Sequence, residues 1–253
     1  ALNLHNAGVK ILGTHPEMID RCEDRNKYSS MLDEIGVKQP AWSALKSLED
    51  AHKFCDDHGY PVLVRPSYVL SGAAMNVAYN REELDAFLGE AVDVSPDHPV
   101  VMTKFLHGAI EVDVYGVAED GEIKAYAISE HVEKGGTHSG DATLVLPAHT
   151  LDKKTMAAIK SDTHKIAKSL EITGPFNTQF LVKDDWIGVI ETNLRASRSV
   201  PFVSKILDVP FVRMATKAML NKDKEFSQRL RSANVCDHAH DLKHVSVKSP
   251  QFS

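Results

Sequence analysis

The chain has 253 residues, of which 43% are hydrophobic and 25% are charged, and its formal net charge at pH 7 is -6. This composition excludes a disordered chain and is typical of a globular protein with one large or two small domains. The negative net charge argues against a nucleic-acid-binding surface over the whole molecule, and the longest apolar runs are too short to span a membrane. We therefore expect neither nucleic acid nor a membrane as a partner.

The three cysteines, Cys22, Cys55 and Cys236, are odd in number and far apart, and their spacing is not that of a zinc site. This usage predicts free thiols in a reducing compartment. The first residues lack the basic-then-apolar pattern of a signal peptide. Because the chain starts without Met and stops abruptly at Ser253, we expect a fragment of a longer polypeptide.

Apolar runs and amphipathic segments alternate through the first hundred residues. Ser47 is a plausible N-cap, with Glu49 and Asp50 in the first turn of the helix that it begins. The predicted elements are a buried strand at 9–12, helices at 16–22, 23–35 and 47–58, a strand at 62–65, a small-residue loop at 66–74, a strand at 75–79 and a helix at 81–92.

The second part of the chain is predicted to form hairpins separated by helices. Asp120-Gly121 and residues 183–185 are the turn signals of two hairpins. The predicted elements are strands at 100–105, 111–117, 123–128 and 142–146, a helix at 151–170, strands at 178–182 and 186–190, helices at 201–207 and 210–220, and a short strand at 245–247. Since no regular βαβ alternation occurs, the order favours an α+β class with antiparallel sheets.

Oxygen-bearing side chains gather on the second hairpin. Pairing of its strands brings Gln179 beside Glu191, and the spacing of two residues puts Asn193 on the same side as Glu191. Mg²⁺ takes hard oxygen ligands, usually one or two carboxylates together with substrate phosphates. The three residues predict a metal site, and the alternative is a hairpin with polar surface residues.

Positive charge follows this hairpin directly. Arg195 and Arg198 are three residues apart and would share a face on a helical turn, where guanidinium groups bind phosphate or carboxylate. Arg65 precedes the loop at 66–74, whose small residues let backbone N–H groups approach phosphate. The loop has a single glycine, Gly72, and is not a P-loop. Surface arginines and a plain turn are the alternative interpretations.

A third polar loop spans residues 130–141. His131 in this loop is a candidate for proton transfer or for stabilising a developing anion, and a structural histidine is the alternative. The histidines and aspartates of residues 237–244 are spaced like metal ligands, but no apolar residues around them would hold them in place. A solvated tail is therefore the better interpretation.

Three separated motifs together resemble the large chain of carbamoyl phosphate synthetase, in its second, C-terminal ATP-grasp unit, which phosphorylates carbamate. The motifs are residues 65–72, 130–141 and 191–205, and the likeness runs from about residue 8 to 220. Residues 69–76 are most similar to eukaryotic, glutamine-dependent enzymes of the pyrimidine type.

The resemblance implies an ATP-grasp fold, with two lobes of antiparallel sheets clasping ATP. It places the end of a preceding domain at residues 1–22 and the ATP-grasp domain at 23–225. Within that domain the lid lobe would span about 38–100 and the large lobe about 101–225. Residues 226–253 would form a linker toward a further C-terminal domain.

The resemblance also implies roles for single residues. Those that would bind ATP are Arg25, Arg65, Ser71, Gly72, Lys104, Leu106, Glu111, Gly136, Thr137, His138, Ser139, Gln179 and Glu191. Those that would hold Mg²⁺ or Mn²⁺ are Gln179, Glu191 and Asn193. Arg195 and Arg198 would face the transferred phosphoryl group or the carbamate, with His131 as a further catalytic candidate.

The implied reaction is phosphorylation of carbamate by ATP within glutamine-dependent carbamoyl phosphate synthesis, for pyrimidine or arginine production. The implied partners are a bicarbonate-phosphorylating half, a glutaminase domain or subunit, and a second copy of the chain. The implied location is the cytoplasm, with the mitochondrion as alternative. Two rivals stay open: another ATP-grasp ligase or carboxylase, which commonly has Glu at the position of Gln179, and a nucleotide-binding regulatory fragment without turnover.

Overall fold

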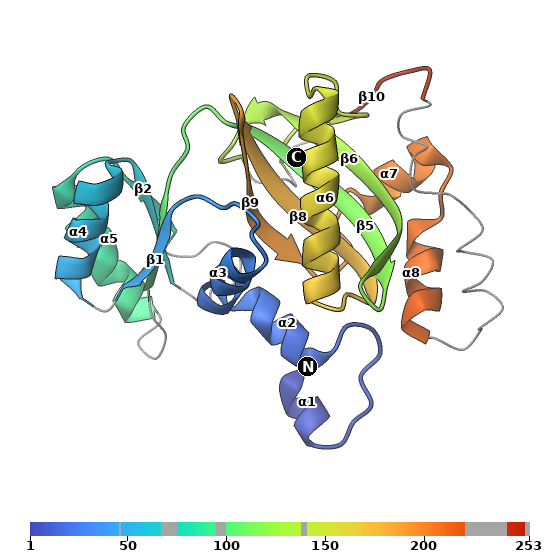
Figure 1. Ribbon diagram of the computed structural model, residues 1–253, viewed down its shortest axis with the longest axis horizontal. Helices are drawn as coiled ribbons and strands as arrows, with labels where there is room; N and C mark the ends of the chain where they lie inside the picture. The colour runs from blue at the N-terminus through green and yellow to red at the C-terminus, as the bar shows by residue number, and fades with distance from the viewer. Residues whose placement is uncertain (46, 67–74, 95–99, 138–140, 221–241, 251–253) are drawn as a thin grey trace. The chain divides into compact units, whose positions relative to one another are not determined.

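The computed structural model describes residues 1–250 except 46, 67–74, 95–99, 138–140 and 221–241. The chain divides into two compact units. Unit 1 comprises Ala1–Cys22 and Gly108–Ser253, and unit 2 comprises Glu23–His107. Each unit is built on its own sheet, and all strand pairs are antiparallel (Figure 1). The predicted α+β class with antiparallel sheets is confirmed.

Unit 2 has a four-stranded sheet in the order β1-β4-β2-β3. Its core forms where α4 and α5 pack on this sheet, with Phe54, Leu84, Val62 and Met102 among the buried side chains. The elements are α3 (Arg25–Glu34), β1 (Trp42–Leu45), α4 (Leu48–His58), β2 (Val62–Pro66), β3 (Asn76–Ala78), α5 (Arg81–Val94) and β4 (Val100–Lys104).

The local signals of unit 2 explain most of these boundaries. Ser47 caps α4 as predicted, because its side chain accepts a hydrogen bond from the backbone N–H of Asp50 at 3.1 Å. Gly59 follows the helix with a φ of 70°, a conformation that glycine adopts without a steric penalty. Strand β1 was not predicted from the sequence. It has four residues and lies at the edge of the sheet, so it carries little apolar pattern.

Unit 1 has a six-stranded sheet in the order β10-β7-β6-β5-β8-β9. Its elements are α1 (Leu2–Asn6), α2 (Pro16–Glu23, whose last residue falls in unit 2), β5 (Ile110–Glu119), β6 (Glu122–Lys134), β7 (Leu144–Leu146), α6 (Lys153–Ser169), β8 (Gly174–Lys183), β9 (Trp186–Asn193), α7 (Val200–Leu207), α8 (Phe211–Leu220) and β10 (Ser246–Lys248). Both predicted hairpins form, with Asp120 and Asp184 at positive φ in their turns.

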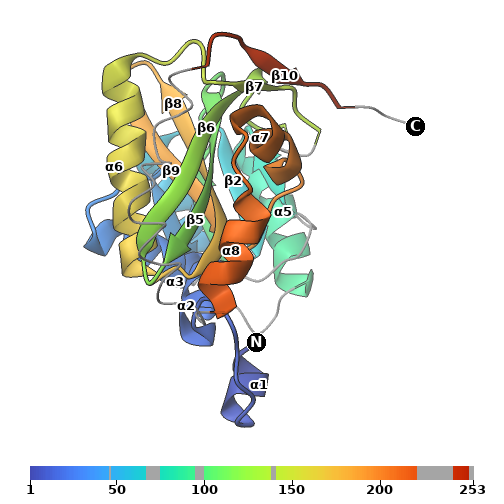
Figure 2. The same cartoon turned by 90° about the vertical axis from the view of Figure 1, so that its right-hand side faces the viewer.

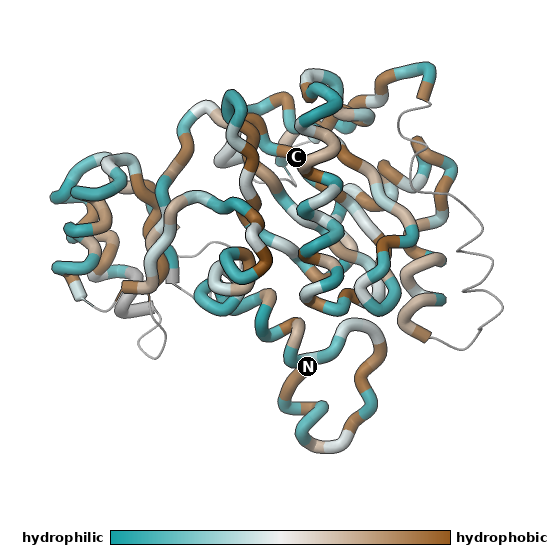
Figure 3. Tube along the Cα trace, in the orientation of Figure 1, coloured by the Kyte–Doolittle hydropathy of each residue, from teal (hydrophilic) through white to brown (hydrophobic). Residues whose placement is uncertain are grey.

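Helices cover both faces of this sheet. The long helix α6 lies on one face, and α7 and α8 lie on the other (Figure 2). Under α7 and α8, apolar side chains such as Tyr115 and Val117 of β5 pack against Val203, Phe211 and Met214. The tube in Figure 3 shows polar residues along α6 and more apolar ones in the strands behind it. No helix in the described ranges has the length and apolar character of a membrane span.

The predicted buried strand at residues 9–12 is wrong. This segment forms no strand, and Val9 and Leu12 are 48% and 52% exposed. The apolar pattern is strand-like, but within the described residues no neighbouring strand pairs with it, and the N–H of Val9 donates instead to the carbonyl group of Leu4 at 3.0 Å. Helix α1, which has no buried residue, was not predicted.

Candidate functional site

One face of the unit 1 sheet changes from apolar to polar along its strands. Strand pairing places Asp113 of β5 opposite Gln179 of β8, and Gln179 opposite Glu191 of β9. Directly paired residues project to the same face, and this is the face of Tyr115, which packs under α7 and α8. The sequence prediction that the hairpin brings Gln179 beside Glu191 is confirmed.

The three predicted metal ligands lie together on the β8–β9 pair. Asn193 donates from Nδ2 to Oε1 of Glu191 at 2.9 Å, and the side chain of Gln179 is nearly buried, at 9% exposure. Arg195 Nη2 lies 3.4 Å from Oδ1 of Asn193. On the opposite face, the hydroxyl groups of Thr178 and Thr192 are 3.0 Å apart and help to join the two strands.

Arg195 and Arg198 do not lie on a helical turn, so that part of the prediction is wrong. Both lie in the irregular segment between β9 and α7, where Arg195 is exposed. Helix α7 begins at Val200 because Pro201 follows it, and proline has no N–H to donate and fits only the first turn of a helix. The two guanidinium groups are therefore carried by a loop at the end of the strand that bears Glu191 and Asn193.

Asp113 organises the buried part of the polar face. Its side chain is 1% exposed and accepts three hydrogen bonds. Tyr115 Oη donates to Oδ2 at 3.0 Å, Asn177 Nδ2 donates to Oδ1 at 3.1 Å, and His131 Nε2 lies 2.9 Å from Oδ2. Asp113 thereby fixes the plane and the orientation of the His131 ring.

His131 lies between two carboxylates. Its Nδ1 is 3.9 Å from Oε1 of Glu111 and has no hydrogen-bond partner in the described part of the chain. Burial opposes the charged imidazolium, but the hydrogen bond to Asp113 and the charges of Asp113 and Glu111 outweigh it and raise the pKa of His131. His131 is thus held between two carboxylates that favour its protonated form.

Glu111 is a buried carboxylate whose ionisation is opposed by burial. It is 4% exposed, and burial raises its pKa to about 7. The charges of Asp113 and Glu191 act in the same direction, while His131 and a hydrogen bond from the backbone of Gly136 oppose them. Negative charge is thus concentrated where the oxygen donors of the β8–β9 pair lie.

This donor set fits a hard divalent cation that arrives with a phosphorylated ligand. Gln179, Glu191 and Asn193 each offer side-chain oxygen atoms, and a cation would relieve the repulsion that Glu191 exerts on Glu111. In the described ranges, no group of three or more His, Cys, Asp or Glu residues could hold a metal ion. One carboxylate and two amides therefore need further oxygen ligands, which phosphates supply.

Glu111 makes the stability of the protein depend on pH. Its pKa is raised in the folded state, so the folded protein binds more protons than the unfolded chain between the ordinary glutamate pKa of 4.5 and about 7. The stabilising contribution is present below pH 4.5 and is lost as pH rises toward 7, by on the order of 3 kcal/mol. We expect Glu111→Gln to flatten this slope in urea unfolding curves measured at several pH values. An unchanged slope would show that Glu111 ionises normally.

The predicted residues of unit 2 lie on three of its elements. Arg25 is the first residue of α3, Arg65 is 7% exposed on β2, and Lys104 ends β4 shortly before Leu106. Lys104 Nζ donates to the backbone carbonyl groups of Gly59 and Tyr60, at 3.1 and 2.8 Å, which fixes its ammonium group.

The two small-residue loops are only partly described. In unit 1, Gly136 and Thr137 follow β6 in a turn, and Gly136 contacts Glu111 through its backbone. Ser71, Gly72, His138 and Ser139 lie outside the described residues, as do Asp237, His238, His240 and Asp241 of the histidine-rich segment.

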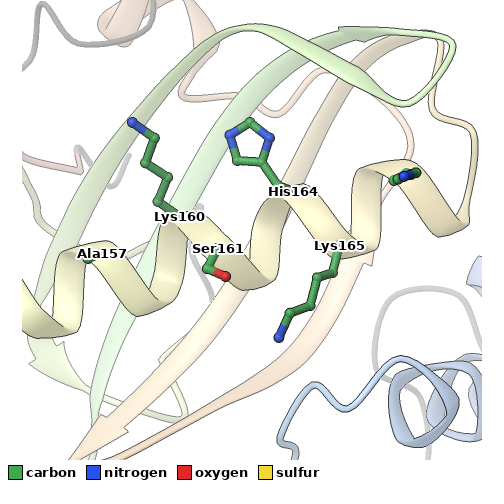
Figure 4. A pocket seen from close by; sticks show the side chains of 6 residues that line it. Ala157, Lys160, Ser161, His164 and Lys165 are labelled. Atoms are coloured by element: carbon green, nitrogen blue, oxygen red, sulfur yellow. The ribbon is translucent and has the colours of Figure 1, made fainter.

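A hollow of about 510 Å³ lies elsewhere, on the outer side of α6 (Figure 4). It is lined by Ala157, Lys160, Ser161, His164, Lys165 and Lys168 and contains none of the predicted site residues. Burial and the charge of Lys160 lower the pKa of His164. This basic surface is separate from the polar face, which α6 does not cover.

The chain matches the family model described as carbamoyl-phosphate synthase L chain, ATP binding domain, over residues 24–225. It is 51% identical over 253 residues to the multifunctional protein URA2 of Saccharomyces cerevisiae, covering all of this chain and 11% of that protein. It is 52% identical over 260 residues to the mitochondrial, arginine-specific carbamoyl phosphate synthase large chain of Neurospora crassa, covering all of this chain and 22% of that one. The chain thus spans a small part of the length of these relatives.

Solved structures share its fold at lower identity. The biotin carboxylase domain of a 2-oxoglutarate carboxylase from Hydrogenobacter thermophilus has a TM-score of 0.76 at 19% identity, over 91% of this chain and 52% of that one. An L-amino acid ligase from Bacillus licheniformis has a TM-score of 0.71 at 22% identity, over 90% and 54%. The predicted ATP-grasp fold is confirmed.

Proposed function

The chain belongs to the family of carbamoyl-phosphate synthase L chain ATP-binding domains, and we propose that it transfers the γ-phosphoryl group of MgATP to carbamate, giving carbamoyl phosphate and ADP. The observation that carries the proposal is the register of the β8–β9 pair. It sets Gln179 opposite Glu191, and Asn193 donates a hydrogen bond to that carboxylate. A pair of arginines follows on the next loop.

Positioning and charge neutralisation suffice for such a transfer, because the migrating phosphoryl group needs little covalent help. Gln179, Glu191 and Asn193 would hold Mg²⁺ or Mn²⁺, which when bound offsets the charge of the phosphates. Arg195 and Arg198 would face the transferred group or the carbamate with guanidinium donors. The carbamate is already an anionic nucleophile, so no strong base is required.

The buried network has a supporting role in this scheme. Asp113 holds His131 through Nε2, so the ring is not free to rotate, and Nδ1 of His131 lies 3.9 Å from Oε1 of Glu111. Glu111 would accept hydrogen bonds from the ribose, with Gly136, Thr137, His138 and Ser139 along the nucleotide. From unit 2, Arg25, Arg65, Ser71 and Gly72 would contact phosphates, and Lys104 and Leu106 would contact adenine.

We propose the same domain boundaries as the sequence predicts, with residues 1–22 ending a preceding domain. The exposed apolar side chains of Val9 and Leu12 support this, since exposed apolar surface is typical of a contact with a further part of a protein. The segment 226–253, proposed as a linker, includes β10, which pairs with β7. Relatives of the chain include multifunctional proteins and a mitochondrial large chain.

In the parent protein we propose a bicarbonate-phosphorylating half, a glutaminase domain or subunit and a second copy of the chain as partners. The pathway would be pyrimidine or arginine synthesis, in the cytoplasm or the mitochondrion. Within the described residues, Cys22 and Cys55 are buried and form no disulfide, which supports a reducing compartment.

The proposal is tested by measuring ADP released from MgATP when carbamate is added. We expect release that depends on carbamate, with neither bicarbonate nor an amino acid able to replace it. Release that responds to bicarbonate or to amino acids instead would point to another ATP-grasp ligase. Binding of ATP without any transfer, even after the bicarbonate-phosphorylating half is added back, would point to a regulatory fragment.

A further inference from the structure

Lys248, near the end of the described chain, belongs to the same row of the sheet as the polar face. Strand β10 pairs with β7 so that Lys248 lies opposite Leu144, and Leu144 lies opposite His131 of β6. Directly paired residues share a face, so the row from the edge of the sheet inward is Lys248, Leu144 and His131. No pattern in the sequence singles out Lys248.

The ammonium group of Lys248 is buried without a partner. Its Nζ has almost no solvent contact and makes no hydrogen bond to any residue that the structure describes. Burial and the charge of Arg198 lower the pKa of Lys248, while Asp113 and Asp141 act in the opposite direction. Arg198, exposed on the loop between β9 and α7, thus acts through its charge on the buried ammonium group of Lys248.

Asp113 makes no hydrogen bond to Lys248. Its Oδ2 is shared by Tyr115 and His131, and its Oδ1 accepts from Asn177. Asp141 is exposed on the surface, where water screens its charge. A buried ammonium without a hydrogen bond is costly in free energy, and an anionic ligand would remove that cost.

We propose that Lys248 and Arg198 together bind a small oxyanion. On the proposed function, from which this identification follows, the anion is the carboxylate group of carbamate or the phosphoryl group of carbamoyl phosphate. The carboxylate group is planar and the phosphoryl group is tetrahedral, and both accept hydrogen bonds from an ammonium and a guanidinium group. Lys248 is then a substrate-binding residue contributed by the strand at the edge of the sheet.

Anion binding is tested without turnover by thermal unfolding of the 253-residue chain with MgADP and either inorganic phosphate or acetate. Phosphate stands for the phosphoryl group and acetate for the carboxylate group, and the anion that raises the wild-type Tm identifies the source. Lys248→Met should weaken binding of that anion by about tenfold or more, while Lys248→Arg should keep most of it. Lys243→Met, at an exposed lysine of the same segment, should bind like wild type.

The unfolding temperature without anion gives a second, independent result. Because the ammonium has no partner to lose, Lys248→Met should leave Tm unchanged or raise it, whereas a lysine with a purely structural role would lower it. Wild-type binding of the anion by Lys248→Met, or no binding by the wild-type chain, would overturn the proposal. If anion binding depends on Lys248 but carbamate elicits no ADP, the anion site stands and the proposed reaction falls.

Discussion

Replacing Glu191 with alanine should reduce metal-dependent ATP turnover by about a thousandfold. Glu191 is the one carboxylate among the three proposed metal ligands, and it also accepts the hydrogen bond that orients Asn193. Its loss removes the charge that attracts the cation and leaves the side chain of Asn193 without the hydrogen bond that orients it. Losses of about 10² to 10³ are typical when a single group that stabilises transition-state charge is removed. ADP release over a range of Mg²⁺ concentrations measures the effect.

The control lies in the same hairpin. Asp185→Ala removes an exposed carboxylate from the turn between β8 and β9 and should leave turnover at the wild-type level. Binding of Mn²⁺, followed by electron paramagnetic resonance, separates loss of the cation from loss of the fold. Native turnover by Glu191→Ala, or Mn²⁺ binding equal to that of the control, would show that Glu191 is not a metal ligand.

The hairpin that carries this site was predictable because its signals are local. Asp184 and its neighbours mark a turn, and apolar runs flank it. The short loop sets Phe180 opposite Val189 and by itself would set Gln179 opposite Ile190, but a β-bulge shifts the register by one residue and brings Glu191 opposite Gln179. The capped helix after Ser47 was predictable for the same reason, since a cap needs only a residue three positions away. Local patterns therefore located the proposed ligands without knowledge of the whole fold.

The buried network around Asp113 depends on contacts between distant residues. Asn177 is 64 residues from Asp113 in the chain, and Lys248 reaches the row of His131 only because β10 pairs with β7. Alternation along β5 placed Asp113 on the face of Glu111 and Tyr115, but it could not show which strands flank β5. The strand predicted at residues 9–12 is wrong because its apolar pattern is strand-like, while no strand in the described part of the chain pairs with it.

Asp113→Asn should destabilise unit 1 by about 3–5 kcal/mol, the range for removing one partner of a buried charge pair. The asparagine would turn an amide NH₂ toward donors that now bind a carboxylate, either Asn177 or Tyr115 and His131. At least one buried donor is then left unsatisfied. Urea unfolding measures the loss, and Asp162→Asn, which breaks an ion pair with Lys165 on the surface of α6, should cost less than about 1 kcal/mol.

The pH dependence of this loss identifies its cause. The field of Asp113 raises the pKa of His131, so the stability that this pairing contributes is fully present below the unfolded pKa and is lost as pH rises through the folded one. The difference in free energy of unfolding between wild type and Asp113→Asn should therefore be larger at about pH 5 than at about pH 9, on either side of the ordinary histidine pKa. The pKa of His131, followed by NMR, should be lower in the variant. A gap that is constant with pH would mean that Asp113 acts through packing and neutral hydrogen bonds, and that His131 is not held as a cation between Asp113 and Glu111.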